Sequence, residues 1–392
     1  DCSQSRGLGD VYKRQINNVI KQKGVALLSA IILVFAVSLI LSNIFYRHQI
    51  DVSQAARSLH SDQAFLIALS GEGWATELLF EDLKENNTDH YGEVWAQALP
   101  LLPVEGGTLT GCLSDLQAGF NLNSFKYYDN SPMQAELDDF EKVGFAKVWL
   151  NLLEIMQIPI NPGRVYTIKD WIDSDNSAGS WGAEQADYEG LDISVIVHND
   201  LFATPTELAS LVNYKIEEVD LLIPWISALP FQTPININTA SLEILQSLSG
   251  SHGQAFIEAV ITGRPFNDLN SFYTQMNDYL ALWDPVKPEV GRANLIWPQH
   301  LISVGSDFFK LYLEAEIGDA KMELVSILHR TKSSGINVIS RDVRLLPALL
   351  PPQRPKSEIE KLFSDDITLN SNQQNFQETN IIQPACLMME YE

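Results

Sequence analysis

An uninterrupted apolar run near the start of the chain is its strongest pattern. Residues 24–46 carry no ionisable side chain apart from the phenol of Tyr46, and a helix needs about 20 apolar residues to cross a bilayer. Almost all acidic residues follow the run, and Lys13, Arg14, Lys21 and Lys23 are among the basic residues that precede it. Because basic flanks stay cytoplasmic, the pattern predicts a single transmembrane helix over residues 25–46, with the bulk of the chain on the other side.

Beyond the membrane run the apolar positions keep a helical spacing. The positions that fit one face are Ile50, Leu59, Leu66, Leu69, Leu78, Leu79 and Leu83. This spacing predicts one helix from Val25 to about Glu85. Gly71 and Gly73 are its weak points, since each costs about 1 kcal/mol relative to Ala.

The pattern then changes to a short strand region and a longer helical one. A polar loop with Pro100, Pro103 and Gly106-Gly107 precedes residues 108–124, which we expect to form strand, turn and strand. Residues 135–230 are rich in helix-compatible apolar spacing. Thr204-Pro205 marks a helix start there, with proline inside the first turn.

The last third of the chain predicts a second helical unit and then a sheet. Residues 231–283 favour helices around a short hairpin, Ser249–Gly253. Alternating apolar and polar residues then predict an antiparallel meander, whose buried face we expect to cover the N-terminal helix. The alternating segments are 301–305, 308–317, 322–331 and 337–345. Residues 348–392, with their Asn and Gln runs, predict a mobile tail.

Composition narrows the class of protein. The 392 residues predict two or three domains. The formal net charge is −24, from 26 basic and 50 acidic residues, which disfavours nucleic acid as a partner because phosphates attract clustered cations. The chain has three cysteines. Cys112 and Cys386 could pair in an oxidising periplasm, but the sequence does not fix their separation, so pairing and free thiols both stay open.

The first residues do not match the rest of the chain. Residues 1–15 resemble read-through of a sequencing adapter. We therefore leave them out of the fold argument, and we expect the natural start to be missing or to lie near Ile16.

An acidic loop between predicted helices offers candidate metal ligands. With Asp173 as position one, Asp175 falls at three, Ser177 at five and Glu184 at twelve, which are oxygen-ligand offsets of a calcium loop. The match is partial, because Gly179 lies one position later than that pattern requires. A divalent cation would relieve the repulsion among the carboxylates, while a solvated acidic loop is the alternative.

The step from Lys23-Gly24 into the apolar run resembles a type IV prepilin-like leader, although a plain membrane anchor is the alternative. In that family a membrane peptidase cuts after the glycine, here Gly24, and methylates the new N-terminus, here Val25. Most members carry Glu at the fifth mature position, where this chain has Ser29. A filament body needs that carboxylate, so within the superfamily its absence points to the K-type minor pseudopilin of type II secretion systems.

Further stretches support the K-type resemblance, which covers residues 21–347. They are Gln63–Ala75, with its Glu-x-Trp-Ala end, Gly119–Ser124, the Asp-Trp-x-Asp-x-Asp loop from Asp170, and a helix-hairpin-helix over residues 231–283. The resemblance implies an α+β pseudopilin fold: a long N-terminal transmembrane helix packed on an antiparallel sheet, with a large inserted all-α region of SAM-like (helix-hairpin-helix) units. The expected boundaries are leader 1–24, membrane helix 25–46, pseudopilin domain 47–124 and 301–347, SAM-like domains 125–230 and 231–300, and tail 348–392.

The resemblance also implies a function. It suggests a non-enzymatic subunit at the tip of a periplasmic pseudopilus, which initiates assembly and supports export of folded proteins across the outer membrane. The expected partners are I-type and J-type minor pseudopilins, the prepilin peptidase and the inner-membrane secretion platform. It implies bound calcium, for which we select Asp173, Asp175, Glu184 and Asp187, with Asp170 in reserve. The N-terminus would be cytoplasmic and the bulk of the chain periplasmic.

Two other classes of function are less consistent with the sequence. The helix-hairpin-helix could belong to a membrane-anchored DNA-binding protein of an uptake system, but its hairpin has no lysine and only Arg264 is close. A membrane-tethered hydrolase would need a nucleophile with a supporting base. The seven histidines are scattered, and His252 is expected to be a surface residue.

Overall fold

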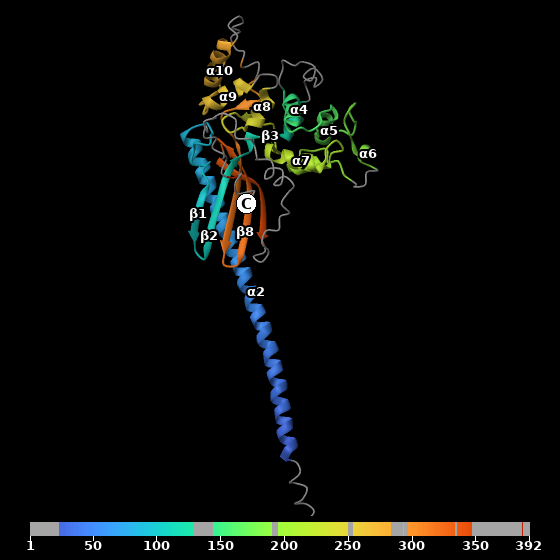
Figure 1. Cartoon of the computed structure of the whole chain (residues 1–392), viewed down its shortest axis with the longest axis vertical. Coiled ribbons are helices and arrows are strands. Elements are labelled where there is room, and N and C mark those ends of the chain that lie inside the picture. The colour runs from blue at the N-terminus through green and yellow to red at the C-terminus, as the bar shows by residue number, and fades with distance from the viewer. Residues whose placement is uncertain are drawn as a thin grey trace, which may run out of the picture. The chain divides into compact units, whose positions relative to one another are not determined.

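The computed structural model describes residues 23–128, 144–189, 195–249, 254–283, 293, 297–333, 335–346 and 386. The chain divides into two compact units, Asp1–Gln63 and Ala64–Glu392. Helix α2 (Lys23–Glu85) belongs to both and is the long blue helix of Figure 1. The predicted single helix from Val25 to about Glu85 is therefore confirmed, and no proline interrupts it.

A five-stranded antiparallel sheet is the centre of the part of the second unit that was expected to be a pseudopilin domain. Its strand order is β1-β2-β7-β8-β9. The strands are β1 (Leu99–Val104), β2 (Gly107–Asp115), β7 (Phe308–Ile317), β8 (Ala320–Thr331) and β9 (Gly335–Leu346). The predicted meander is confirmed for its last three strands, which alternate buried and more exposed residues along β7 and β8.

The C-terminal half of α2 packs on one face of this sheet. The helix positions that face it are buried and mostly small, namely Ala64, Ala68, Gly71, Ala75 and Leu79. At Gly71 a Cβ atom would lie 3.0 Å from Leu313 Cδ1 and 3.1 Å from Leu109 Cδ2. Small residues therefore let the helix approach the strands closely, and the sheet covers the helix as predicted.

Two of the predicted strand regions need correction. The first hairpin is formed by β1 and β2, and Gly106 makes its turn with a φ of +87°. Residues 108–124 do contain a strand, a turn and a short strand, as predicted, but the second strand, Phe120–Asn121, pairs in parallel with Ile226–Ser227 and not with β2. Pro100 and Pro103 fit because β1 is an edge strand, where a missing N–H is tolerated. The segment 301–305 is not part of the meander, since β6 (Ile302–Ser303) pairs in parallel with β5 (Ile235–Asn236) in a separate sheet.

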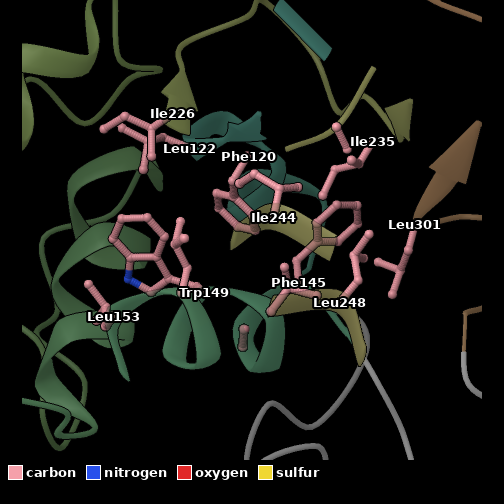
Figure 2. Packing of buried hydrophobic residues seen from close by; sticks show 14 of the residues in the cluster. Phe120, Leu122, Phe145, Trp149, Leu153, Ile226, Ile235, Ile244, Leu248 and Leu301 are labelled. Atoms are coloured by element: carbon pink, nitrogen blue, oxygen red, sulfur yellow. The ribbon is translucent and has the colours of Figure 1, made fainter. Parts of the chain in front are cut away.

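The region between β2 and β7 is mainly helical, as predicted. Its elements are η2 (Leu116–Ala118), β3 (Phe120–Asn121), η3 (Leu122–Tyr128), α4 (Phe145–Ile155), α5 (Gly163–Ile172), α6 (Gln185–Tyr188), η4 (Pro205–Ser210), α7 (Ile216–Leu222), η5 (Ile223–Trp225), β4 (Ile226–Ser227), α8 (Leu242–Ser249), α9 (Gln254–Gly263) and α10 (Leu269–Trp283). Figure 2 shows one core shared by β3, α4 and α8, in which Phe120 and Trp149 lie beside Ile244. The ring centroids of Phe120 and Trp149 are 5.3 Å apart.

Asparagine side chains close the start of the helical region. Asn121 Oδ1 accepts a hydrogen bond from the Leu229 N–H at 3.0 Å, and Asn123 Nδ2 donates to the carbonyls of Leu229 and Phe202 at 2.9 Å each. All three interactions are buried, so they satisfy backbone groups that water cannot reach. They join residues about a hundred positions apart and tie the start of the region to its middle.

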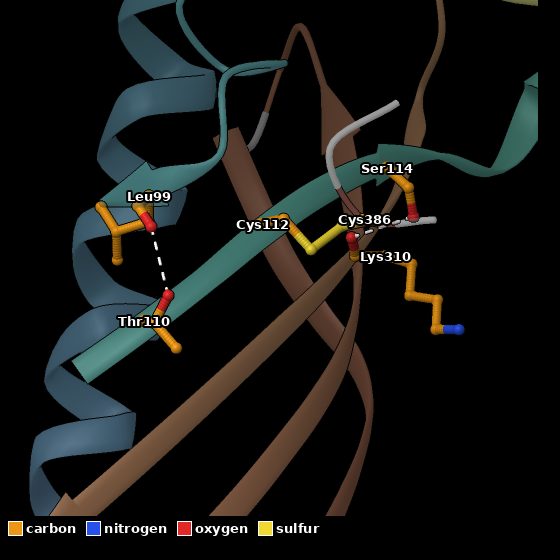
Figure 3. Close-up of a disulfide and its surroundings, with 6 residues drawn as sticks. All are labelled: Leu99, Thr110, Cys112, Ser114, Lys310 and Cys386. Carbon is orange, nitrogen blue, oxygen red and sulfur yellow. Dashed lines mark hydrogen bonds between the residues drawn. A yellow bond between two sulfur atoms is a disulfide. The ribbon is translucent and has the colours of Figure 1, made fainter. Parts of the chain in front are cut away.

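The open question of Cys112 and Cys386 is answered by a disulfide. Cys112 lies on β2 and the two sulfur atoms are bonded, as Figure 3 shows. Both residues are buried. Beside them, Thr110 Oγ1 donates to the Leu99 carbonyl and Ser114 Oγ to the Lys310 carbonyl. The predicted mobile tail, residues 348–392, otherwise lies outside the described residues.

Candidate functional site

The acidic loop connects the end of α5 to the start of α6. Trp171, in the last turn of α5, is buried between two aromatic side chains: it stacks on Phe202 at 6.1 Å between ring centroids and meets Tyr188 of α6 edge-on at 6.0 Å. These contacts hold both ends of the loop on the same apolar base. The carboxylates between them are therefore carried on a fixed frame.

Asp170 is a structural member of the loop. Its Oδ2 accepts a hydrogen bond from the Gly179 N–H at 3.1 Å. A Cβ atom at Gly182 would collide with Asp170 Oδ2, so a side chain there would displace this carboxylate. Asp170 thus holds the loop in its folded-back path.

Three of the four selected ligands converge. Asp173, Asp175 and Glu184 each offer an oxygen atom, and these atoms all lie within 4.8 Å of one another. The fourth, Asp187, accepts a hydrogen bond from the Glu184 N–H at 2.9 Å and so caps the start of α6. The loop spacing read from the sequence therefore brings positions one, three and twelve together in space.

Glu184 is the most unusual member of the cluster. It is only 4% exposed, and among the described residues neither of its carboxylate oxygens has a hydrogen-bond partner. Burial, and then the negative charges of Asp170, Asp173, Asp175 and Asp187, raise its pKa to about 7. A buried carboxylate without a donor is costly, and a cation bound beside it would offset that cost.

The donor set suits a hard divalent cation. Calcium takes six to eight oxygen ligands from carboxylates, carbonyls and water, and here carboxylates supply the converging atoms. Asp173 and Asp175 lie at the open side of the cluster and Glu184 at its buried side. A cation bound among them would reduce the repulsion that the folded loop now carries.

The N-terminal part of α2 carries the predicted processing site. Val25, the expected new N-terminal residue, is 66% exposed, and the helix is long and apolar enough to cross a membrane by its length and composition. Ser29 Oγ donates to the Ala26 carbonyl within the same helix, at 3.0 Å. The position at which the resemblance predicts Glu in most family members is therefore occupied by a hydroxyl that bonds within its own helix.

Comparison with known proteins decides the family. A family model for the type II secretion system (T2SS), protein K, matches residues 118–231. The type II secretion system protein K of Pseudomonas aeruginosa is 30% identical over 333 residues, which is 82% of this chain and 93% of that protein. The type II secretion system protein K of Aeromonas hydrophila is 28% identical over 333 residues, which is 82% of this chain and 97% of that protein. The chain belongs to the type II secretion system protein K family, the K-type minor pseudopilins.

A solved structure supports the fold. The GspK-GspI-GspJ complex of enterotoxigenic Escherichia coli contains a chain that matches with a TM-score of 0.61 at 22% identity, covering 74% of this chain and 99% of that one. Together with the helix, sheet and helical insertion described above, this confirms the predicted pseudopilin fold class.

In the predicted helix-hairpin-helix of this protein K chain, the nearby basic residue Arg264 binds a backbone carbonyl of the chain itself. Arg264 Nη2 donates to the Ala240 carbonyl at 2.7 Å, and burial lowers its pKa to about 10. Residues 250–253 of the hairpin lie outside the described residues. The side chain that a DNA-binding function would need is therefore used to join α9 to the segment before α8.

A second acidic cluster was missed by the sequence analysis. Asp82, Asp89 and Glu93 also bring oxygens within 4.8 Å of one another, but Arg330 of β8 donates to Asp82 at 2.8 Å and to Asp89. Asp89 also accepts from the Ser306 N–H at 2.7 Å. Because an arginine supplies the counter-charge, this cluster joins α2 to the sheet. The three carboxylates are close in sequence, but Arg330 is more than 200 positions away, so no local spacing could reveal their counter-charge.

Proposed function

We propose that this chain is a minor pseudopilin that sits at the tip of the type II secretion pseudopilus, in complex with I-type and J-type companions. One observation carries the proposal. The chain combines a helix long enough to cross a membrane with a pseudopilin sheet, and a bulky helical insertion lies between β2 and β7 of that sheet. The structural neighbour is a GspK-GspI-GspJ complex, which names the class of partner.

The parts suggest how such a subunit would act. Before assembly the apolar helix would hold it in the inner membrane, with the prepilin peptidase cutting between Gly24 and Val25. After extraction by the secretion platform, the same helix would pack against neighbouring helices. The insertion is too large for a repeating filament, and Ser29 offers no carboxylate to the N-terminal amine of a neighbour, so a position at the end is favoured. Pseudopilus initiation and support of protein export follow from that position.

Calcium would rigidify the acidic loop in this setting. Asp173, Asp175 and Glu184 would hold the ion, with Asp187 completing the acidic end of the loop. The proposed role is structural and non-enzymatic, and the bulk of the chain would be periplasmic. A cation bound there would stabilise the part of the helical region that carries α5 and α6.

Co-purification of the full chain tests the proposal. The chain would be co-expressed with the I-type and J-type pseudopilins of the same genome and extracted in detergent, with and without a calcium chelator. We expect a ternary complex that survives size-exclusion chromatography. Failure to form a complex, together with retention of labelled DNA at moderate salt, would contradict the tip function and support the uptake alternative.

A further inference from the structure

An apolar cavity of about 170 Å³ opens between α2 and the start of β1. Trp74 and Leu78 line it from the helix, Val94 and Ala98 from the loop before β1, and Leu313 from the sheet. All of these residues belong to the second compact unit. The cavity is separate from the acidic loop, and the function proposed above makes no use of it.

Small residues and an irregular strand create this space. Gly71 and Ala75 present little side chain from α2. Gly111 forms part of the floor on β2, where a Cβ atom would collide with the Tyr312 carbonyl. The register of β1 on β2 shifts between Leu99 and Leu102, and Leu99 and Pro100 at this irregular start of the strand line the cavity. The hollow is therefore built into the backbone and does not depend on one side-chain rotamer.

The rim exposes unusually apolar surface. Trp74 is 52% exposed and Val94 is 71% exposed. Half-exposed tryptophans beside a preformed pocket are typical of the energetic centres of protein interfaces. A cavity of about 150 Å³ is large enough for one benzene ring, so this one has room for a single large apolar side chain.

The exposed surface of α2 beside the cavity is mainly negatively charged. Glu77, Glu81 and Glu85 follow on the exposed side of α2, within three turns of Trp74. The single basic residue of that stretch, Lys84, pairs with Glu81 at 2.6 Å. An incoming segment with lysine or arginine beside its apolar side chain would complement this field, whereas an acidic segment would be repelled.

We propose that this α2–β1 groove receives one aromatic or leucine side chain, flanked by basic residues, from a companion pseudopilin. The proposal rests on the assembly function proposed above. Within that function it assigns an interface to a surface of the pseudopilin part and not to the helical insertion. Trp74 would form one wall of the pocket and the glutamates of α2 would guide the approach.

Two variants of the full chain test the groove in the co-purified complex. Trp74→Ala removes one wall, and Ala98→Trp places a ring at the mouth of the pocket without deleting a contact. We expect each to weaken binding of a companion about 30-fold, the effect of losing an interface hot spot. Ile216→Ala is the control, because Ile216 is 61% exposed at the start of α7, outside both the groove and the acidic loop, and should leave this affinity unchanged.

The outcomes separate the groove from the assembly function. If the wild-type chain forms no complex, the proposed function fails before the groove is tested. If the wild type assembles and both groove variants bind equally well, the groove is not the interface and the function stands. If the chain alone forms a dimer that Trp74→Ala dissolves, the occupant is a second copy, which also overturns the proposal.

Discussion

The buried carboxylate of Glu184 leads to a prediction about calcium binding by the acidic loop. Its two oxygens are buried and have no donor among the described residues, while Asp173 and Asp175 lie within reach of the same ion. We predict that Glu184→Gln abolishes stabilisation of the full chain by calcium. In the wild type that stabilisation should reach about 2.7 kcal/mol at a calcium concentration about 100 times the Kd. Thermal unfolding with and without calcium measures it.

A neighbouring glutamate supplies the control for this prediction. Glu189 lies just after α6 and is exposed, so Glu189→Gln should keep the full response to calcium. A Glu184→Gln protein that gains as much stability from calcium as the wild type would show that the ion, if it binds, does not use this cluster.

Asp89 makes a prediction about pH. Burial raises its pKa to about 7, although Arg330 and the Ser306 N–H oppose the shift. The folded state therefore binds this proton more tightly than the unfolded state, so the contribution to stability is full below about pH 4 and is lost as pH rises through 7. The free energy of unfolding of the wild type should fall relative to Asp89→Asn between pH 5 and pH 8, by at most about 1.4 kcal/mol per pH unit. Parallel pH curves for the two proteins would contradict this.

The two acidic clusters mark the limit of prediction at this scale. Asp173, Asp175 and Glu184 could be selected because a calcium loop fixes its ligands at short sequence offsets. Asp187 was selected with them and Asp170 was kept in reserve, since the roles of both depend on backbone N–H groups that only the folded chain places. Arg330 and Asp89 meet across 241 positions, and no sequence rule connects them.

At the scale of elements, the contact between α2 and the sheet gives a matched pair of glycine variants. An added Cβ atom at Gly73 meets nothing within 4 Å, whereas at Gly71 it meets Leu313 and Leu109. We predict that Gly73→Ala stabilises the full chain by about 1 kcal/mol, the helix propensity of alanine over glycine. Gly71→Ala should gain less or lose stability, because the two leucines must move. Denaturant unfolding followed by circular dichroism measures both.

This pair tests the closeness of packing directly. Equal stabilisation by the two alanines would mean that the helix stands further from β2 and β7 than the structure shows. The sequence marked both glycines as weak points of a helix but could not rank them, because their difference lies in what faces them across the sheet.

Strand β1 shows why some elements escape sequence reasoning. Pro100 and Pro103 argue against a central strand, and they were assigned to a loop. β1 nevertheless pairs with β2 at the edge of the sheet, where the outward side needs no N–H donors. In contrast, β7 and β8 lie in the middle and alternate clearly, so their strands were predicted. Edge and centre differ only in tertiary context.

At the scale of the whole molecule, one covalent bond joins the sheet to a residue near the C-terminus. Cys112 and Cys386 are 274 positions apart, and the sequence left their pairing open because separation along the chain says nothing of distance in space. A cross-link over so long a loop removes much of the freedom of the unfolded chain. It also agrees with the proposed periplasmic location, since such bonds persist in oxidising compartments.

We therefore predict that the disulfide is a major source of stability. In the chain-entropy account, replacing both cysteines with serine should lower the free energy of unfolding by about 5 kcal/mol. A reductant added during unfolding should reproduce that loss in the wild type and change nothing in the double variant. Cys2→Ser is the control and should behave as the wild type. Because Cys112 and Cys386 are 4% and 3% exposed, reductant should act slowly on the folded protein and rapidly once it unfolds. Quick reduction under native conditions would mean that the end of the chain detaches from β2 without unfolding of the sheet, and the stabilisation expected from the cross-link would then be absent.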